Sequence, residues 1–293
     1  MSPYYYLISS LPELVRDDAF SAHPYPVFDD FVREELDEKD YTDMKRCFLL
    51  NDISNIADSL EAGGGNSQSD DDLDDMVNLK TPSFLDMADL KQGLEDPDTL
   101  FSFFADAIFD WRAEQRQFPH KTVHWELFYR SLVALTTGES KESRQFIGFP
   151  LDYLVFEVRL RNLTTALAYR KTSRSYEGEI VVFDDFSQML AESSTPDFGL
   201  SREFGVMETL IEVLSKEDVL VAEKQVTAVR WNWLDEVVGY RLFSLDAVFA
   251  YALKIADVQR WLILKPEEGR RSLDSLLKRL QMNIKSITQK EYS

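Results

Sequence analysis

Apolar residues recur along most of the chain at spacings of three and four positions, the period of an amphipathic helix. In the middle of the chain the two spacings alternate through Phe146, Phe149, Tyr153, Phe156, Leu160, Leu163 and Leu167. This sustained heptad pattern predicts a long helix that packs along its length against another long helix. Gly148 and Pro150 indicate that the helix begins near Pro150, and from there to Lys171 it would extend roughly 30 Å.

The same period predicts about ten helices in all. The clearest patterns cover residues 26–36, 41–60, 100–111, 119–138, 207–214, 219–238, 244–264 and 266–287. Asp98 and Thr99 are expected to cap the third of these helices, and Gly138 is a typical residue at the end of the fourth. The last helix carries a clean apolar stripe made of Leu273, Leu276, Leu277, Leu280, Ile284 and Ile287.

Only two stretches of the chain have convincing β propensity. The opening Tyr4 to Ile8 could be strand or helix, and Glu177 to Phe183 could be a short hairpin strand or a buried linker. Residues 62–75 include three glycines and five aspartates, so we expect a flexible acidic surface loop there. The prediction is an all-α protein made of long-helix bundles, with at most minor β structure.

Charge is distributed unevenly along the 293 residues, whose formal net charge is −20. Residues 1–100 contain 24 acidic and 7 basic side chains, whereas residues 251–293 contain 9 basic and 5 acidic ones. The excess of acid argues against nucleic-acid binding, which needs clustered Lys and Arg. A dipolar chain of this kind could orient between two differently charged partners, although solubility alone also explains an acidic composition.

The cellular location can be predicted from what the sequence lacks. No run of 18 apolar residues is present, and residues 1–12 lack the basic start and cleavage site of a secretory signal. The only cysteine, Cys47, is expected to be a buried apolar residue in a reducing compartment. We therefore expect a cytoplasmic protein.

Motifs for catalysis are also missing from the sequence. It contains no glycine-rich phosphate-binding loop and no nucleophile elbow, so we expect neither an enzyme nor a cofactor. His120 and His124 are one helical turn apart, a spacing that zinc sites use, and Glu126 could complete such a site. Surface or capping histidines at the start of a helix are the preferred interpretation of the pair, so a metal-dependent enzyme stays a minor alternative.

Glu157 is the most unusual charged residue, because it lies beside Phe156 within a highly apolar helix. It could form an ion pair with Arg161 four positions later. An ion pair between packed helices is the simplest interpretation of this residue.

Three stretches of the chain resemble known sequences. Residues 157–171, EVRLRNLTTALAYRK, resemble a motif of the C/d family, the central-stalk connectors of V-type ATPases, and residues 248–270 resemble the last segment of the same family. The opening YYYLISSLPEL is similar to an uncharacterised bacterial branch encoded with V-type ATPase genes. The positions that carry the resemblance, and are thus signature or interface candidates, are Glu157, Arg161, Asn162, Arg170, Lys171, Tyr251, Lys254, Gly269 and Arg270.

The resemblance implies a fold and a function. Members of that family are funnels of three related helical lobes, for which residues 1–95, 96–200 and 201–293 are the candidates here. They connect the membrane rotor ring to the central axle on the cytoplasmic face of the inner membrane, and take part in proton or sodium transport without catalysing a reaction. The acidic first third and residues 62–75 have no counterpart in the resemblance. The alternative is a stand-alone helical adaptor or regulatory protein.

Overall fold

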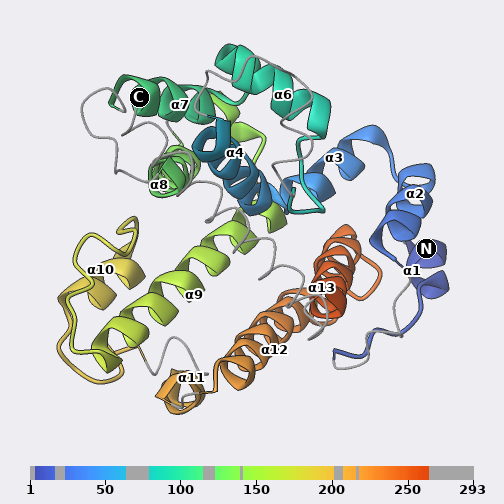
Figure 1. The fold of residues 1–293 in the computed structure, drawn as a ribbon. Helices are drawn as coiled ribbons and strands as arrows, with labels where there is room; N and C mark the ends of the chain where they lie inside the picture. Colours follow the sequence, from blue (N-terminus) through green and yellow to red (C-terminus); the bar gives the residue numbers. More distant parts are fainter. Residues whose placement is uncertain are drawn as a thin grey trace, which may run out of the picture.

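The computed structural model describes residues 4–16, 24–63, 79–114, 123–138, 141–200, 207–215 and 218–263. Within these ranges the protein contains twelve α-helices, two short 3-10 helices and no strand, which confirms the all-α class (Figure 1). The elements are α1 (Tyr5–Ser10), α2 (Tyr25–Glu35), α3 (Glu38–Arg46), α4 (Leu49–Gly63), α6 (Met87–Glu95), η1 (Pro97–Thr99), α7 (Ser102–Glu114), α8 (Val123–Thr137), η2 (Lys141–Arg144), α9 (Phe149–Lys171), α10 (Asp185–Glu192), α11 (Met207–Ser215), α12 (Val219–Val238) and α13 (Leu245–Ile263).

Helix α9 lies between two hydrophobic cores (Figure 1). Its predicted seam, from Phe149 to Leu163, enters a larger core that also contains residues of α2, α3, α12 and α13. Its opposite face, with Leu154 and Val158, enters a second core formed with α4, α7 and α8. Phe146, the first residue of the predicted seam, precedes the helix and belongs to the second core. Because α9 is buried on two sides, it fixes the positions of the helices of both cores that pack against it.

The ends of several predicted helices are confirmed. Pro150 lies in the first turn of α9, and Gly148 before it has a φ of +65°, a conformation that favours glycine. Gly138 follows the last residue of α8 with a φ of +74°, as expected of a residue that ends a helix. The opening residues from Tyr5 form helix rather than strand.

The predicted single helix over residues 41–60 is wrong, because the chain breaks between α3 and α4. Cys47 and Phe48 form a turn there, with the Phe48 amide donating to the carbonyl of Lys45 at 3.0 Å. The break lets Cys47 and Phe48 enter the larger core while Leu49 enters the second one. Burial of Cys47, by contrast, is confirmed.

The predicted cap of the helix after Leu100 is also wrong. Asp98 and Thr99 form the short helix η1, and α7 begins only at Ser102. Its first turn is capped from a distance by Glu142 of η2, which accepts from the Ser102 amide at 3.0 Å and from its hydroxyl at 2.7 Å. A carboxylate at this end is favoured by the helix dipole.

The β-prone run from Glu177 to Phe183 is a linker and not a strand, and within it only Ile180 and Val181 are buried. Val181 is fully buried, and its backbone bonds to a side chain instead of to a second strand. In the acidic stretch 62–75, Ala62 and Gly63 end α4, and residues 64–75 lie outside the described residues. The predicted helix over 266–287 also lies outside them, and the three-lobed arrangement stays a prediction.

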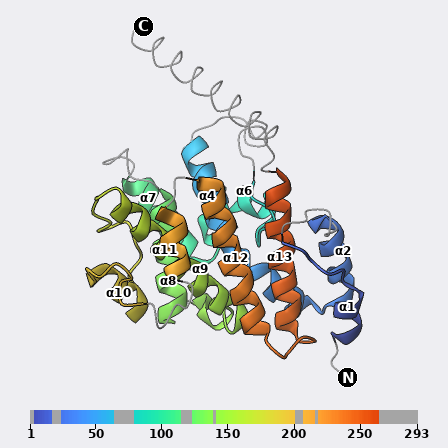
Figure 2. The same ribbon diagram turned by 90° about the horizontal axis from the view of Figure 1, so that it is seen from below.

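Helices α12 and α13 form an antiparallel pair, whose connection lies at the end of the molecule where α1 lies (Figure 2). The far end of the pair is marked by Arg260, in the last turns of α13, which lies 3.6 Å from the Glu223 carboxylate of α12. No helix in the described part of the chain is both long and apolar enough to cross a membrane.

Candidate interaction surface

A buried ion triad joins three of the longest helices. Arg230 of α12 donates to both carboxylate oxygens of Glu157 on α9, at 3.0 Å for the Nη2 to Oε2 bond, and its Nη1 lies 3.3 Å from Asp257 of α13. The three side chains are only 11 to 12 % exposed. The predicted ion pair between packed helices is therefore present, but its cation is Arg230 and not Arg161.

The electrostatics of the triad follow from its burial. Burial raises the pKa of Asp257, and the positive charge of Arg230 opposes that shift. Burial would lower the pKa of Arg230, but Glu157 and Asp257 together raise it well above its ordinary value. Each ionised group thus depends on the others for charge compensation, and removing one leaves a buried charge behind.

Aromatic side chains from α9 pack on the same face of α12. Trp233 stacks on Phe156 with ring centroids 4.5 Å apart and planes 14° apart. Its ring centroid also lies 5.9 Å from that of Tyr153 and 6.1 Å from that of Phe149. Helix α12 therefore packs against the first half of the α9 seam, where Phe149, Tyr153 and Phe156 lie.

Asn162 is fully buried, and its side-chain amide group forms two hydrogen bonds with the backbone of Val181. Its side-chain amide donates to the Val181 carbonyl at 2.7 Å, and its side-chain oxygen accepts from the Val181 amide at 3.0 Å. The two bonds satisfy the buried backbone amide and carbonyl of Val181, which have no neighbouring strand to pair with. Asn162 is thus a positioning residue for the linker after α9.

Arg170 and Lys171 hold the C-terminal end of α9. Arg170 donates to the carbonyls of Ser193 and Thr195, and its guanidinium carbon lies 3.6 Å from the centre of the Phe198 ring. Lys171 donates to the Leu214 carbonyl of α11 at 3.3 Å. Both side chains therefore bind other parts of the same chain.

The remaining signature residues are Arg161 on α9, Tyr251 and Lys254 on α13, and two that lie outside the described residues. The Tyr251 hydroxyl donates to the Pro12 carbonyl at 3.0 Å, and Lys254 pairs with Asp235 and lies 5.1 Å from the centre of the Trp231 ring. Tyr251 and Lys254 also line a pocket of about 260 Å³ between α13 and residues 8–14. Arg161 is largely buried, and this burial lowers its pKa, an effect that Glu179 opposes.

Four of the predicted residues cannot be placed with their side chains. Gly269, Arg270 and His120 lie outside the described residues, and His124 lies in the first turn of α8 without a described side chain. Among the side chains that the structure does describe, no group of three His, Cys, Asp or Glu residues could hold a metal ion.

An exposed apolar tip, which the sequence analysis missed, lies at the connection between α12 and α13. Tyr240 is fully exposed, Leu242 is 57 % exposed and Phe243 is 39 % exposed. The ring of Phe243 lies 4.7 Å from that of Tyr5, which brings the exposed Tyr6 of α1 to the same place. We call Tyr6, Tyr240, Leu242 and Phe243 the apolar tip.

Hydrogen bonds fix the shape of the apolar tip. Gly239, with a φ of +49°, ends α12 and donates its amide to the Asp235 carbonyl at 2.8 Å. Arg241 folds back, so that its guanidinium reaches the Val237 carbonyl at 2.9 Å and the Asp246 carboxylate at 2.8 Å. Tyr240 and Leu242, on either side of Arg241, face solvent, and Arg241 itself stays 62 % exposed while it makes these two contacts. Apolar residues in a helix connection, where polar ones are usual, were the sequence signal for this feature.

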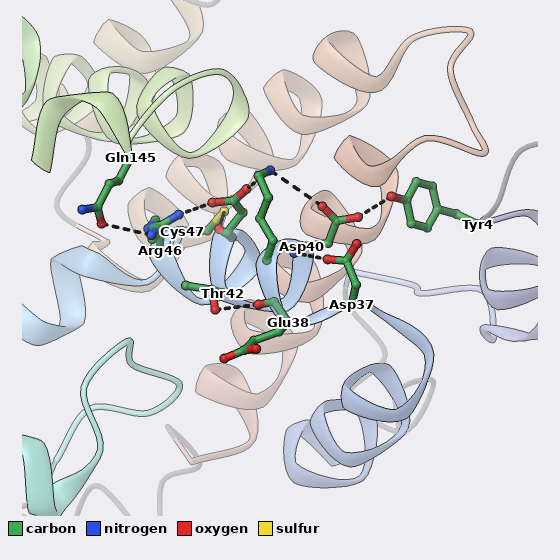
Figure 3. Close-up of polar contacts among 10 residues, drawn as sticks. Tyr4, Asp37, Glu38, Asp40, Thr42, Arg46, Cys47 and Gln145 are labelled. Carbon is green, nitrogen blue, oxygen red and sulfur yellow. Dashed lines mark hydrogen bonds and ion pairs between the residues drawn. The ribbon is translucent and has the colours of Figure 1, made fainter.

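A polar network along α3 connects the apolar tip region to the rest of the molecule (Figure 3). It starts where the Tyr4 hydroxyl donates to the Asp40 carboxylate, and it ends where Arg46 donates to the Gln145 side chain at 3.2 Å. Asp37 caps the helix by accepting from the Asp40 amide at 2.8 Å. The Asp40 contact raises the pKa of Tyr4 to about 12, mainly through the hydrogen bond.

Acidic side chains are exposed on two helix ends in the same region as the apolar tip. Asp37 and Glu38 are exposed at the start of α3, the helix whose Asp40 accepts the hydrogen bond from Tyr4 just before α1. Asp235, which pairs with Lys254, and Glu236 are exposed in the last turn of α12. We call these four residues the acidic rim. An apolar centre with a charged rim is the usual anatomy of a protein–protein interface.

The fold and this surface define an all-helical protein with a rigid, exposed apolar tip. The chain matches, over residues 1–284, the family described as protein of unknown function (DUF2764), and it belongs to that family. Neither a curated protein nor a solved structure gave a match. The relation to the C/d family of V-type ATPase connectors stays a prediction.

Proposed function

We propose that this protein is a non-catalytic central-stalk connector of a V-type rotary ATPase. It couples the membrane rotor ring to the central axle during proton or sodium transport, on the cytoplasmic face of the membrane. The observation that carries the proposal is the apolar tip, in which Tyr240, Leu242 and Phe243 are exposed on a connection held by hydrogen bonds. Rigid aromatic residues of this kind are typical anchors of protein interfaces.

The body behind the apolar tip is suited to transmitting force. The tip belongs to the α12–α13 pair, and the ion triad of Glu157, Arg230 and Asp257 ties that pair to α9. Helix α9 in turn contributes to both hydrophobic cores. A load applied at the tip would therefore pass into helices that are packed and ion-paired, and not into a loop.

The charges around the apolar tip indicate the chemistry of its partner. The acidic rim of Asp37, Glu38, Asp235 and Glu236 favours a partner with an apolar pocket and basic residues around it. The same rim disfavours direct contact with anionic lipid headgroups, which attract Lys and Arg instead. Attachment to the membrane would then go through the other proteins of the complex.

The choice of a V-type ATPase rests on the sequence resemblance. In residues 157–171 and 248–263, the signature positions that the structure describes lie at helix contacts, from the Glu157 ion pair to the Tyr251 hydrogen bond with Pro12. Residues that maintain the packing of a connector need not touch its partners. The apolar tip is therefore a better candidate for the partner surface than the signature residues are.

Purification of the native complex tests the proposal. A V-type ATPase isolated from the source cells through its central axle should contain this chain in stoichiometric amount. If the intact complex is recovered with its rotor ring and axle but without this chain, the connector function is wrong. A reverse purification that recovers this chain with other proteins, and never with parts of a V-type ATPase, would favour the stand-alone adaptor instead.

A further inference from the structure

A second exposed apolar feature lies at the opposite end of the α12–α13 pair from the tip. The first three residues of α12 are Val219, Leu220 and Val221, and they are 74 %, 57 % and 42 % exposed. Consecutive residues of a helix point about 100° apart, so three in a row are exposed together only where the turn projects beyond the packed body. Three consecutive exposed apolar residues are costly in water unless something covers them. We call them the α12 apolar turn.

The position of this turn is fixed by local hydrogen bonding. Asp218 caps α12 by accepting a bond from the Val221 amide at 3.1 Å, so the helix begins at Val219. First-turn positions are usually polar, because acidic side chains there are favoured by the helix dipole. Helix formation alone therefore does not explain why three successive first-turn residues are apolar.

The end of the described chain lies next to the α12 apolar turn. Arg260 pairs with Glu223 at 3.6 Å and donates to the Thr227 hydroxyl at 3.4 Å, which brings the last turns of α13 against the first turns of α12. Ile263 ends α13 one turn later. Residues 264–293 therefore start beside the α12 apolar turn.

The sequence of residues 264–293 fits this surface. It begins with Leu264, Lys265 and Pro266, and a proline there favours a turn after α13. The apolar stripe follows at Leu273, Leu276, Leu277, Leu280, Ile284 and Ile287. The segment contains seven basic and four acidic residues, and the first turns of α12 expose Asp218, Lys224 and Glu223, the last of which pairs with Arg260.

We propose that residues 264–293 dock onto the α12 apolar turn of the same chain through this apolar stripe. Nine residues separate Ile263 from Leu273, which is about 14 Å even in helical conformation and therefore long enough to reach the first turn of α12. The apolar tip lies at the other end of α13, about 28 Å away by the same rise per residue for 19 residues, and is not the surface covered. The inference does not depend on the V-type ATPase proposal.

Amide hydrogen exchange of the full-length chain tests this docking. We expect residues 264–293 to exchange at least about tenfold more slowly than an unstructured segment, and Leu220→Asp to remove most of that protection. An aspartate at the second position of α12 suits the helix dipole, so the amides of α12 should stay protected in the variant. The double variant Leu276→Asp/Leu277→Asp, which changes the apolar stripe itself, should also remove most of the protection of residues 264–293.

A matched control and three contrary results complete the test. Val27→Asp changes a residue that is 54 % exposed on α2, and it should leave the exchange of residues 264–293 unchanged. Rapid exchange of the segment in the unmodified protein would overturn the proposal, and so would equal protection in the Leu220→Asp variant. Protection that increases with protein concentration would mean docking on a second copy, which also contradicts the proposal.

Discussion

Arg230 on α12 binds the carboxylate of Glu157 on α9, although 73 positions separate them in the sequence. The same guanidinium also reaches Asp257 on α13, so one side chain fixes the relative position of three helices. This contact connects the α12–α13 pair, which carries the apolar tip, to the helix shared by both cores. It is the central structural relationship in the proposed path of force.

The first prediction concerns Arg230→Met. The substitution leaves Glu157 and Asp257 as buried carboxylates without a cation, which costs roughly 3–5 kcal/mol when one partner of a buried ion pair is removed. Urea denaturation followed by circular dichroism measures the change in free energy of unfolding. Arg241→Met is the matched control, because Arg241 pairs with Asp246 while it is 62 % exposed, and its loss should cost less than about 1 kcal/mol. Equal effects of the two substitutions would show that the triad does not stabilise the helix packing.

The second prediction concerns Asn162→Ala. The variant loses both bonds to Val181 and leaves a buried amide and carbonyl unsatisfied, at a cost of roughly 2–4 kcal/mol. Thermal and urea unfolding measure the loss. Gln188→Ala removes a side-chain bond to the exposed Glu192 and should change stability by less than about 0.5 kcal/mol. If Asn162→Ala costs as little as this control, the linker after α9 is held by other contacts.

The third prediction concerns the pH dependence that comes from Asp52. This fully buried carboxyl of α4 accepts from the amides of Phe84 and Leu85 at 2.9 and 2.8 Å, and burial raises its pKa from 3.8 to about 7. Between these two values the folded protein holds a proton that the unfolded chain releases. The contribution of Asp52 to the free energy of unfolding is therefore largest below about pH 4 and is lost as the pH rises to about 7.

Asp52→Asn should flatten this part of the pH profile. The free energy of unfolding measured at pH 5 and at pH 8 should fall more for the unmodified protein than for the variant. The pKa of Asp257 is also raised, but Asp257 titrates in both proteins. Its contribution therefore cancels, and the difference between the two pH profiles reports on Asp52. A carboxyl carbon titration by NMR that gives Asp52 a midpoint near pH 4 would contradict the prediction.

Much of the fold could be predicted from the sequence, because the helical period is a local property. The heptad seam predicted α9, whose first half packs against α12, and Gly138 marked the end of α8. The break at Cys47 and Phe48 could not be predicted, since apolar residues continue on both sides of it. Only the positions of the two cores in space explain why the chain turns there.

The candidate site was harder to predict, because its contacts join distant parts of the chain. Glu157 stood out as a charge in an apolar helix, but a rule for neighbours four positions apart leads to Arg161 and never to Arg230. The apolar tip depends on the contact of Phe243 with Tyr5, two residues that are 238 positions apart in the sequence. Its local signal was the apolar run after Gly239, in a position where a polar helix connection is usual.

The fourth prediction separates binding from folding at the apolar tip. Tyr240→Ser with Leu242→Ser changes side chains that are mostly exposed, so the free energy of unfolding should stay within about 0.5 kcal/mol of the unmodified protein. Urea denaturation measures this. A large loss of stability would mean that the tip is part of the packed body and not a surface for a partner.

Binding of the purified protein to the purified axle and to the purified rotor ring of the V-type ATPase is the most direct test of the proposed connector function. Calorimetry should show that the unmodified chain binds both partners, and that the double variant loses at least about thirtyfold in affinity for one of them, the effect of removing interface anchors worth about 2 kcal/mol. Val182→Ser, which changes an exposed residue of the linker after α9, should bind both partners as tightly as the unmodified protein. Failure of the unmodified chain to bind either partner, or unchanged binding of the double variant to both, would contradict the account.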